Sequence, residues 1–532
     1  MLPREAPEPA RRPGQQPLPR LRLIGAVRSR AARWGPATAA GAVSGALTAL
    51  AFPPADAWPL AFVALAPMAF VFLRPHRHPV GAASAAFGVT FFGLLLSWIR
   101  LFGPEAYVAL VAAETVLVVA ALGAGGAAAR RLPPPWGAIL FPVAFLAGEY
   151  VRSRLLFGGF GWGGLGYTQH DHPALLRLAA YTGVWGLTLV VAATGLLLER
   201  ALTLVRRSPL RAAACVSAGV LLVVLPGRLP VGAPGGSGAR IAVVQGDAPE
   251  GTADPSADDR DVLRSHLTLT APLADRDPSL VVWPESAVDI DPFRDPEVMD
   301  ALVDSVRAIR APFLVGATTD EPDGRFRNSS LLVTPDGKVS QRYDKQHLVP
   351  FGEYVPFRRI LVPLVDELQR VPRDGIPGSE ATVLTIPEGR FSVAICFEST
   401  FPGIVRQFVD RGAGLLIVST NDSSFGRTAA AAQHLAFAQV RAAEHRTWVL
   451  QAALTGISAA VAPSGEVVAR TDLFEPAVLV QDVRFATART VYARLGDWLP
   501  ALCLAALVTA LVAGAARARR RTPTEAPRAV RV

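Results

Sequence analysis

Three residues in the second half of the chain carry side chains suited to acyl transfer, and the first of them is Cys396. It follows the short apolar run 391–395 and precedes the acidic Glu398 closely. A thiolate is the strongest nucleophile that a side chain offers, but it needs a base or a nearby cation to activate it. Cys396 is therefore a candidate nucleophile. Cys215 and Cys503 lie in long apolar stretches, where a cysteine usually fills space.

The candidate cation is Lys345. Of the 53 basic residues in the chain, only Lys338 and Lys345 are lysines. Lys338 lies in a Pro-Asp-Gly-Lys sequence typical of a solvated hairpin tip, whereas Lys345 lies in an apolar-flanked loop that runs to Glu353. Arginine cannot replace lysine where a compact ammonium must approach a developing oxyanion. The retention of Lys345 in an arginine-dominated chain is suggestive of such a role.

The candidate base is Glu285. It follows Pro284 at the end of the apolar run 280–283. The proline restricts the backbone at this strand exit, so the carboxylate is held in place. With Cys396 and Lys345, Glu285 completes a set of base, nucleophile and cation.

These side chains need a scaffold, and the charged block 238–488 predicts an α/β domain. Short β-branched runs in it end at polar residues, which is where α/β proteins place their chemistry. Fully apolar strands that alternate with helices indicate a sheet covered by helices. The predicted strands are 241–244, 280–283, 313–315, 328–334, 391–395 and 415–418, with a hairpin turn at 335–338 and a helix at 429–446.

The remainder of the chain is far more apolar than this block. Of the 44 acidic residues, 8 precede residue 238, 34 lie in 238–488 and 2 follow. The whole chain is 18% charged, against ~25% for an ordinary soluble protein. A helix needs ~20 apolar residues to cross a bilayer, and eight stretches are predicted to do so: 37–52, 57–73, 80–99, 107–129, 136–151, 178–198, 210–225 and 498–516.

The sequence therefore predicts five parts. They are a disordered basic tail (1–35), a transmembrane domain of about seven helices (36–230), the α/β domain (238–488), a C-terminal transmembrane helix (497–516) and a basic tail (517–532). Arginines gather in both tails and in alternate loops, and cytoplasmic loops collect positive charge. This predicts cytoplasmic termini and an extracytoplasmic α/β domain. Arg152, Arg154 and Arg177 break the pattern, so we assign them a functional or interfacial role.

Several other kinds of site are disfavoured by the sequence. The net charge of +9 comes from loops and tails, not from a basic face of the α/β domain, so no nucleic-acid partner is expected. The three cysteines form no CxxC pair, which excludes a disulfide scaffold or a zinc ribbon. The pairs His76/His78 and His170/His172 lie in loops with no cysteine nearby, and no metal site is predicted from them.

Four motifs in order give the chain a resemblance to the nitrilase, or carbon–nitrogen hydrolase, superfamily. They are Trp283-Pro-Glu285-Ser, Lys345 before His347-Leu-Val-Pro-Phe-Gly-Glu353, Ile395-Cys396-Phe-Glu398, and Asn421-Asp422 with Phe425-Gly426. With a multi-helix membrane domain in front and one helix behind, residues 36–516 resemble the apolipoprotein N-acyltransferase family. Phe397 departs from the pattern, because many relatives carry tyrosine there.

The resemblance implies an α-β-β-α sandwich with a Glu–Lys–Cys triad. Glu285 would be the general base, Lys345 would stabilise the tetrahedral oxyanion, and Cys396 would be the nucleophile. Glu353 would support the lysine and the cysteine, and Glu398 would help to close the site. No metal and no other cofactor is implied.

The implied reaction has two steps. Cys396 would attack the sn-1 acyl ester of a phospholipid donor, giving a thioester and a lysophospholipid. The α-amine of the S-diacylglyceryl cysteine of an apolipoprotein would then take the acyl chain as an amide. The protein would act as a monomer in the bacterial plasma membrane, and the segment 348–379 is predicted to be an interfacial arm or lid.

Two other functions remain open at this stage. The same triad would serve a membrane-tethered amidase with water as the acyl acceptor. A non-catalytic scaffold for another envelope enzyme, such as a polyprenyl-phosphate glycosyltransferase, would retain the fold alone. The eight predicted membrane helices favour lipid chemistry over the amidase, and the presence of Glu285, Lys345 and Cys396 together argues against the scaffold.

Overall fold

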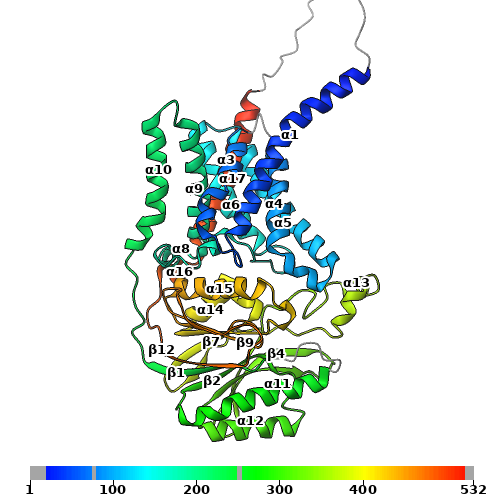
Figure 1. The fold of residues 1–532 in the computed structure, drawn as a ribbon, viewed down its shortest axis with the longest axis vertical. Helices are drawn as coiled ribbons and strands as arrows, with labels where there is room; N and C mark the ends of the chain where they lie inside the picture. The colour runs from blue at the N-terminus through cyan, green and yellow to red at the C-terminus, as the bar shows by residue number, and fades with distance from the viewer. Residues whose placement is uncertain (1–18, 75–78, 248–254, 522–532) are drawn as a thin grey trace, which may run out of the picture.

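A computed structural model describes residues 19–74, 79–247 and 255–521, which form a helical domain stacked on an α/β domain (Figure 1). Residues 1–18 of the predicted N-terminal tail, residues 522–532 of the predicted C-terminal tail, and His76 with His78 lie outside the described residues. Helix α1 begins at Pro19, inside the segment predicted to be a disordered tail. Helix α17 continues to Arg521, past the predicted helix end at residue 516.

The helical domain places helices at all eight predicted positions. Only four helices in the described residues are long and apolar enough to cross a membrane, namely Pro104–Ala129, Val184–Leu204, Pro209–Arg228 and Trp498–Arg517, so a count of eight spans is not confirmed. The long elements are α1 (Pro19–Leu50), α4 (Val80–Leu95), α5 (Pro104–Ala129), α6 (Pro134–Arg152), α9 (Val184–Leu204), α10 (Pro209–Val224) and α17 (Trp498–Arg521).

Two of the predicted spans are not continuous helices. The stretch 57–73 breaks into α2 (Ala61–Ala64) and α3 (Ala66–Phe72), where Pro67 falls in the first turn of α3 and cannot donate a helix hydrogen bond to the turn before it. The stretch 178–198 is divided at Gly183, whose φ of 67° lies in the left-handed region, so α8 (Ala179–Thr182) ends there and α9 begins at Val184. Both boundaries correct the sequence prediction.

The α/β domain contains two six-stranded sheets, which agrees with the predicted strands and hairpin. The first sheet has the order β12-β1-β2-β3-β4-β5 and the second β11-β10-β9-β8-β7-β6. Their strands are β1 (Gly238–Gln245), β2 (Leu280–Val288), β3 (Phe313–Asp320), β4 (Phe326–Val333), β5 (Val339–Asp344), β6 (Leu384–Ile386), β7 (Gly389–Ile395), β8 (Leu415–Thr420), β9 (Val449–Ala453), β10 (Ala459–Val461), β11 (Val467–Arg470) and β12 (Ala477–Arg484).

The two sheets pack face to face between two helical layers, giving the predicted α-β-β-α order (Figure 1). Helices α11 (Pro255–Thr270) and α12 (Pro296–Ile309) cover the first sheet, and α14 (Pro402–Asp410) and α15 (Ala430–His445) cover the second. Buried residues of both sheets, such as Val282 and Val393, share one core. Fully apolar strands are expected where both faces of a sheet are covered.

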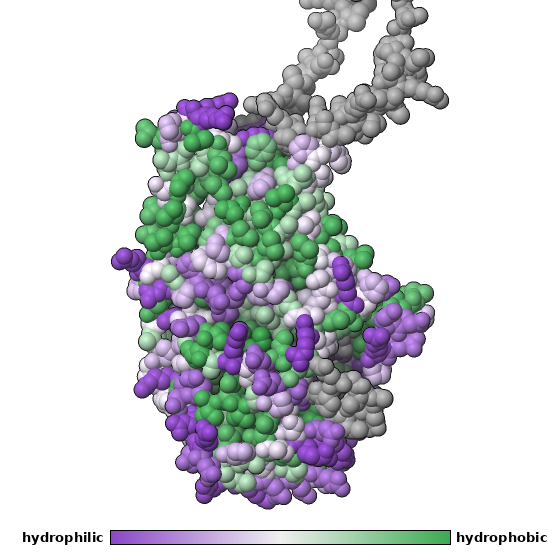
Figure 2. All heavy atoms as spheres, viewed as in Figure 1, coloured by the Kyte–Doolittle hydropathy of each residue, from purple (hydrophilic) through white to green (hydrophobic). Residues whose placement is uncertain are grey.

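Helix α15 lies between the second sheet and the helical domain, so it is buried on both sides (Figure 1). Phe437 and Val440 of this helix join the core of the helical domain, whereas Leu435 and Ala442 join the core between the sheets. Figure 2 shows hydrophobic residues over much of the visible face of the helical domain and hydrophilic residues at the junction of the two domains. Helix α15 therefore joins the second sheet to the helical domain.

Candidate active site

Cys396 lies where β7 ends and the short helix η7 (Cys396–Thr400) begins. Its φ of 50° is in the left-handed region, which is uncommon for a residue with a Cβ and is frequent at functional sites. The residue is partly buried. Parallel pairing of β7 with β8 brings the end of β8 to the same edge of the sheet, so residues that follow the two strands are neighbours.

Lys345 follows β5 and is almost fully buried, with 1% of its side chain exposed. Its Nζ donates hydrogen bonds of 2.9 Å to Oε1 of Glu285 and 2.9 Å to Oε1 of Glu353. Burial opposes the charge of the ammonium, but the two carboxylates outweigh it and hold the pKa of Lys345 well above its usual range. The structure therefore brings three of the five predicted residues into direct contact, with the lysine charged.

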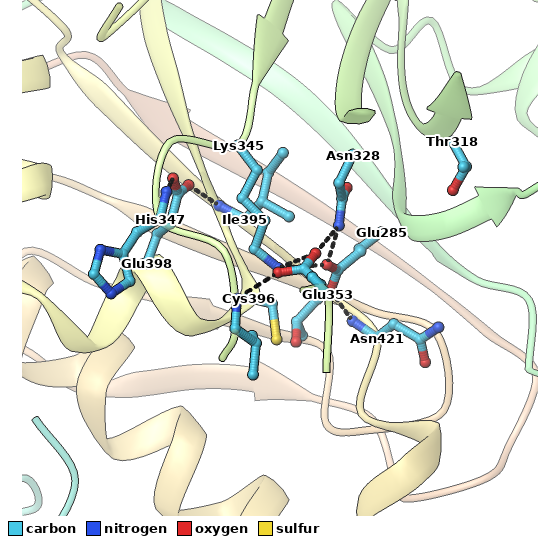
Figure 3. Close-up of polar contacts among 12 residues, drawn as sticks. Glu285, Thr318, Asn328, Lys345, His347, Glu353, Ile395, Cys396, Glu398 and Asn421 are labelled. Carbon is cyan, nitrogen blue, oxygen red and sulfur yellow. Dashed lines mark hydrogen bonds and ion pairs between the residues drawn. The ribbon is translucent and has the colours of Figure 1, made fainter. Parts of the chain in front are cut away.

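Glu285 lies in β2, and its two carboxylate oxygens have different partners. Oε2 accepts a hydrogen bond of 2.7 Å from the backbone N–H of Asn421, and Oε1 accepts bonds from Lys345 and from the amide of Asn328. The side chain is thus held on both sides, as the position after Pro284 predicts. Figure 3 shows the carboxylates of Glu285 and Glu353 gathered between Lys345 and Asn328.

Asn328 is a site residue that the sequence analysis missed. Its Nδ2 lies 2.6 Å from Oε1 of Glu285 and 2.8 Å from Oε1 of Glu353. The only signal was a polar residue at the start of a mostly apolar run, and many such residues are solvated. Its carbonyl accepts a hydrogen bond of 2.9 Å from the N–H of Lys345, so one residue positions all three charged groups.

Glu353 closes the loop that follows Lys345. Its second oxygen accepts a hydrogen bond of 2.7 Å from the backbone N–H of Val349. The loop from Lys345 to Glu353 is thereby tied back on itself, with the lysine and this carboxylate at its two ends. This arrangement agrees with the predicted supporting role of Glu353 toward the lysine.

The thiol of Cys396 is held in its neutral form. Burial raises its pKa well above the usual value, and the negative charge of Glu285 raises it further, while Lys345 opposes both effects. A thiol in this state needs a base at the moment of attack. Glu285 is the carboxylate that acts most strongly on this thiol.

Glu398 is fully buried and binds backbone N–H groups instead of the triad. Its Oε1 accepts hydrogen bonds from Gln346 (2.7 Å) and His347 (3.1 Å), and its Oε2 accepts one from Ile395 (2.8 Å). Burial raises the pKa of Glu398 to about 7, although these bonds and that from the Tyr343 hydroxyl favour the anion. The carboxylate joins the nucleophile turn to the loop that carries Lys345.

A loop of the helical domain lies against the nucleophile turn. The buried guanidinium of Arg152 pairs with Glu114 at 2.8 Å and donates to the carbonyls of Phe160 (3.0 Å) and Trp162 (2.7 Å). The ring of Phe160 packs 6.1 Å from that of Phe397, which follows the nucleophile. Arg152 thus holds, from within the helical domain, the loop that contacts the nucleophile turn.

The other singled-out residues lie away from the triad. The Lys338 side chain is 78% exposed, as predicted for a hairpin tip. One group in the described residues has the spacing of metal ligands: atoms of Asp56, His170 and Asp171 lie within 4.8 Å of one another. His170 Nδ1 is 2.7 Å from Gln439 and its Nε2 is 3.0 Å from Asp56, so hydrogen bonds between the two domains account for this cluster.

Comparison with known proteins accounts for both domains. Residues 44–197 match the family model of the apolipoprotein N-acyltransferase N-terminal domain, and residues 240–493 match that of carbon–nitrogen hydrolase. An apolipoprotein N-acyltransferase of Geobacter metallireducens is 33% identical over 493 residues, which cover 88% of this chain and 94% of the relative. The chain belongs to the apolipoprotein N-acyltransferase family.

A second relative agrees with this membership, and one solved structure is also similar over the α/β domain. An apolipoprotein N-acyltransferase of Mycolicibacterium smegmatis is 32% identical over 532 residues, covering 92% of this chain and 88% of the relative. The crystal structure of Nit3 from Saccharomyces cerevisiae, of the nitrilase superfamily, has a TM-score of 0.36 and 19% identity, covering 47% of this chain and 90% of that one. The predictions of an acyltransferase and of a nitrilase-like domain are confirmed. The roles of individual residues remain predictions.

Proposed function

We propose that this member of the apolipoprotein N-acyltransferase family moves a fatty acyl chain from the sn-1 position of a phospholipid to the N-terminal amine of a diacylglyceryl-modified apolipoprotein. The contact that carries the proposal is the buried pair of hydrogen bonds from Lys345 to Glu285 and Glu353, beside a neutral thiol. A base, a fixed cation and a nucleophile in one site are what two-step acyl transfer requires.

In the first step Glu285 takes the proton of Cys396 as the sulfur attacks the ester carbonyl. The ammonium of Lys345 stabilises the oxyanion, because a charge fixed in a buried site acts far more strongly than it does in water. The carbon–oxygen bond of the ester then breaks, and Glu285 returns the proton to the departing lysophospholipid. The acyl chain remains on Cys396 as a thioester.

In the second step the free amine of the apolipoprotein attacks the thioester carbonyl. Glu285 accepts a proton from the amine, the carbon–sulfur bond breaks, and Glu285 passes that proton to the departing sulfur, which restores the thiol of Cys396. The thioester stores the activation of the acyl group. The residues of one chain complete the cycle, and we therefore propose that the protein acts as a monomer. Glu353 and Asn328 would keep Lys345 and Glu285 in place throughout.

We further propose that the helical domain spans the bacterial plasma membrane with both termini in the cytoplasm and the α/β domain outside. Both substrates are anchored in a bilayer by acyl chains, so the active site must lie at its surface. Lys338 sits on an exposed hairpin of the α/β domain. Lys338→Cys should react with an impermeant maleimide in intact cells, and labelling only after cell lysis would contradict this orientation.

Mass spectrometry of the purified protein mixed with phospholipid tests the chemistry. We expect a fatty-acyl adduct on the peptide that contains Cys396 and none on the peptides with Cys215 or Cys503. Addition of a diacylglyceryl peptide should discharge the adduct and yield N-acyl peptide. Accumulation of free fatty acid instead would favour the amidase, and full cellular function of Cys396→Ala would favour the scaffold.

A further inference from the structure

A second buried polar network contacts the backbone of the nucleophile, and the triad mechanism does not use it. His434, on α15, is 1% exposed. Its Nε2 lies 2.9 Å from the hydroxyl of Ser399 and 3.2 Å from the carbonyl oxygen of Cys396. On the other side of the ring, Nδ1 lies 3.1 Å from Oδ1 of Asp422.

The partners of this ring favour an imidazolium. A neutral imidazole has one N–H, so it cannot donate both to Asp422 and to the carbonyl of Cys396, whereas an imidazolium can. Burial opposes the charge, but Asp422, the Cys396 carbonyl and the more distant Glu285 outweigh it and raise the pKa of His434. The helical domain covers the ring with Trp162, whose centroid is 5.9 Å away.

Asp422 is itself fixed in the orientation that this pairing needs. It is 1% exposed, and its Oδ1 accepts a hydrogen bond of 2.8 Å from the hydroxyl of Thr420 as well as facing His434. An acid, an imidazole and a backbone carbonyl therefore form a continuous buried chain that ends at the nucleophile.

The carbonyl of Cys396 is a sensitive place for such a contact. A residue with a Cβ rarely adopts the left-handed conformation, so the surroundings must hold Cys396 there. The hydroxyl of Ser399 donates to this carbonyl at 2.9 Å, and the same hydroxyl lies 2.9 Å from Nε2 of His434. Hydrogen bonds to this carbonyl restrict rotation about the Cα–C bond of Cys396. They therefore also restrict the direction in which Cβ and the thiol point.

We propose that His434, as an imidazolium paired with Asp422, is a positioning residue that holds the carbonyl of Cys396 and thereby aims the thiol at the acyl donor. It gives up no proton in the reaction. The inference deepens the proposed function and rests on Cys396 being the acylated nucleophile.

The test compares the full-length variants His434→Gln and Asp422→Asn with the wild type. The measurement is the single-turnover rate of acyl-enzyme formation on Cys396, followed by mass spectrometry between pH 5.5 and 9 over a range of phospholipid concentrations. His445→Gln is the matched control, since His445 is equally buried on the same helix and neither of its ring nitrogens has a hydrogen-bond partner.

For His434→Gln we expect a maximal rate at pH 5.5 at least tenfold below that of the wild type, with the half-saturating phospholipid concentration unchanged. In Asp422→Asn the imidazole loses its anion and its pKa falls. The ratio of this variant's rate to the wild-type rate should therefore rise as the pH is lowered and the ring regains its proton. His445→Gln should follow the wild type throughout.

A merely structural role would give a ratio for Asp422→Asn that does not change with pH. That result overturns the inference, and so does a His434→Gln rate within twofold of the wild-type rate. In both cases, acylation of Cys396 in the wild type still supports the proposed function. A wild type that never acylates Cys396 overturns both. If His434→Gln does not fold, the pH series of Asp422→Asn decides alone.

Discussion

Asn328 donates a hydrogen bond of 2.6 Å to the same oxygen of Glu285 that accepts from Lys345. The proposed base is thus held by a neutral donor and a charged one together. The amide of Asn328 also donates to Glu353, so it links the same two carboxylate oxygens that Lys345 links.

Replacement of Asn328 should therefore slow acylation of Cys396. A hydrogen bond to a charged group contributes about 1.5–3 kcal/mol, so Asn328→Ala should lower the rate roughly 10- to 100-fold. Asn328→Asp has nearly the same shape but places a third carboxylate in the cluster, and we expect a larger loss. Single-turnover acylation measured for both variants checks this, and equal rates for the two would contradict the electrostatic part of the argument.

The two lysines of the chain offer a matched pair of variants. Lys345→Met removes the charge that pairs with both Glu285 and Glu353, and breaking a buried pair in this way costs about 3–5 kcal/mol. We expect loss of acyl-enzyme together with a lower unfolding temperature in detergent. Lys338→Met should change neither, because that side chain is 78% exposed. A Lys345→Met protein with normal acylation would contradict the role of the lysine.

Much of this site could be predicted from sequence because its chemistry lies at strand ends. Cys396 and Glu285 follow apolar runs, and Lys345 is conspicuous among arginines, so residue type and position indicate them directly. Asn328 and His434 gave no such signal. Their partners lie 43 residues away at Glu285 and 38 residues away at Cys396, and only the pairing of strands and the docking of α15 bring them together.

The helix boundaries of the membrane domain show where hydropathy alone is insufficient. The run 178–198 is apolar throughout, yet a single glycine with positive φ divides it. Likewise Glu398 reads as a site carboxylate from its place near Cys396, whereas the structure uses it to bind backbone N–H groups of two loops. An apolar pattern indicates which residues are buried, and proximity in sequence indicates which residues lie near the nucleophile. Neither shows where the backbone turns or which groups a side chain binds.

The stability of the protein should fall at alkaline pH through His170, which pairs with acidic groups inside the helical domain, where that domain contacts Gln439 of α15. Burial disfavours the charged ring, but Asp171 and Asp56 outweigh it and raise the pKa of His170 to about 9, from an ordinary 6.5. The folded state therefore binds this proton more tightly than the unfolded state. The resulting stabilisation is complete below pH 6.5 and is lost as the pH rises to about 9.

The expected size of this effect is about 3 kcal/mol, from roughly 1.4 kcal/mol for each pKa unit. His170→Gln should remove it, so the difference in unfolding temperature between wild type and variant should shrink as the pH rises from 6.5 to 9. Thermal unfolding of both proteins in detergent measures this. A difference that stays constant over this interval would contradict the assignment to His170.

The buried pair of Arg152 and Glu114 should hold the loop that packs on the nucleophile turn. Arg152→Met releases the carbonyls of Phe160 and Trp162 and leaves Glu114 buried without its partner, which costs about 3–5 kcal/mol. In the double variant with Glu114→Gln, the unpaired charge is gone. We expect its unfolding temperature to recover while acyl transfer stays slow, because the loop is still released. Recovery of both quantities together would show that Arg152 acts on stability alone.

The segment around α13 (Arg358–Leu361) should act as an arm on the lipid surface. It projects from the α/β domain (Figure 1), and its apolar side chains are exposed, with Phe357 at 69% and Leu364 at 75%. It also meets the helical domain, because the rings of Phe357 and Phe157 lie 6.4 Å apart. Transfer of one such side chain from water to lipid is worth about 1.5–3 kcal/mol.

Phe357→Ser with Leu364→Ser should therefore raise the half-saturating phospholipid concentration tenfold or more. Alkylation of Cys396 by iodoacetamide needs no lipid, so its rate should change little in the same variant. Val468→Ser with Val480→Ser, at exposed positions of β11 and β12, is the matched control and should affect neither rate. If the Phe357 and Leu364 substitutions slow alkylation as much as lipid turnover, the segment shapes the active site itself, and the exposed apolar surface is not there to bind lipid.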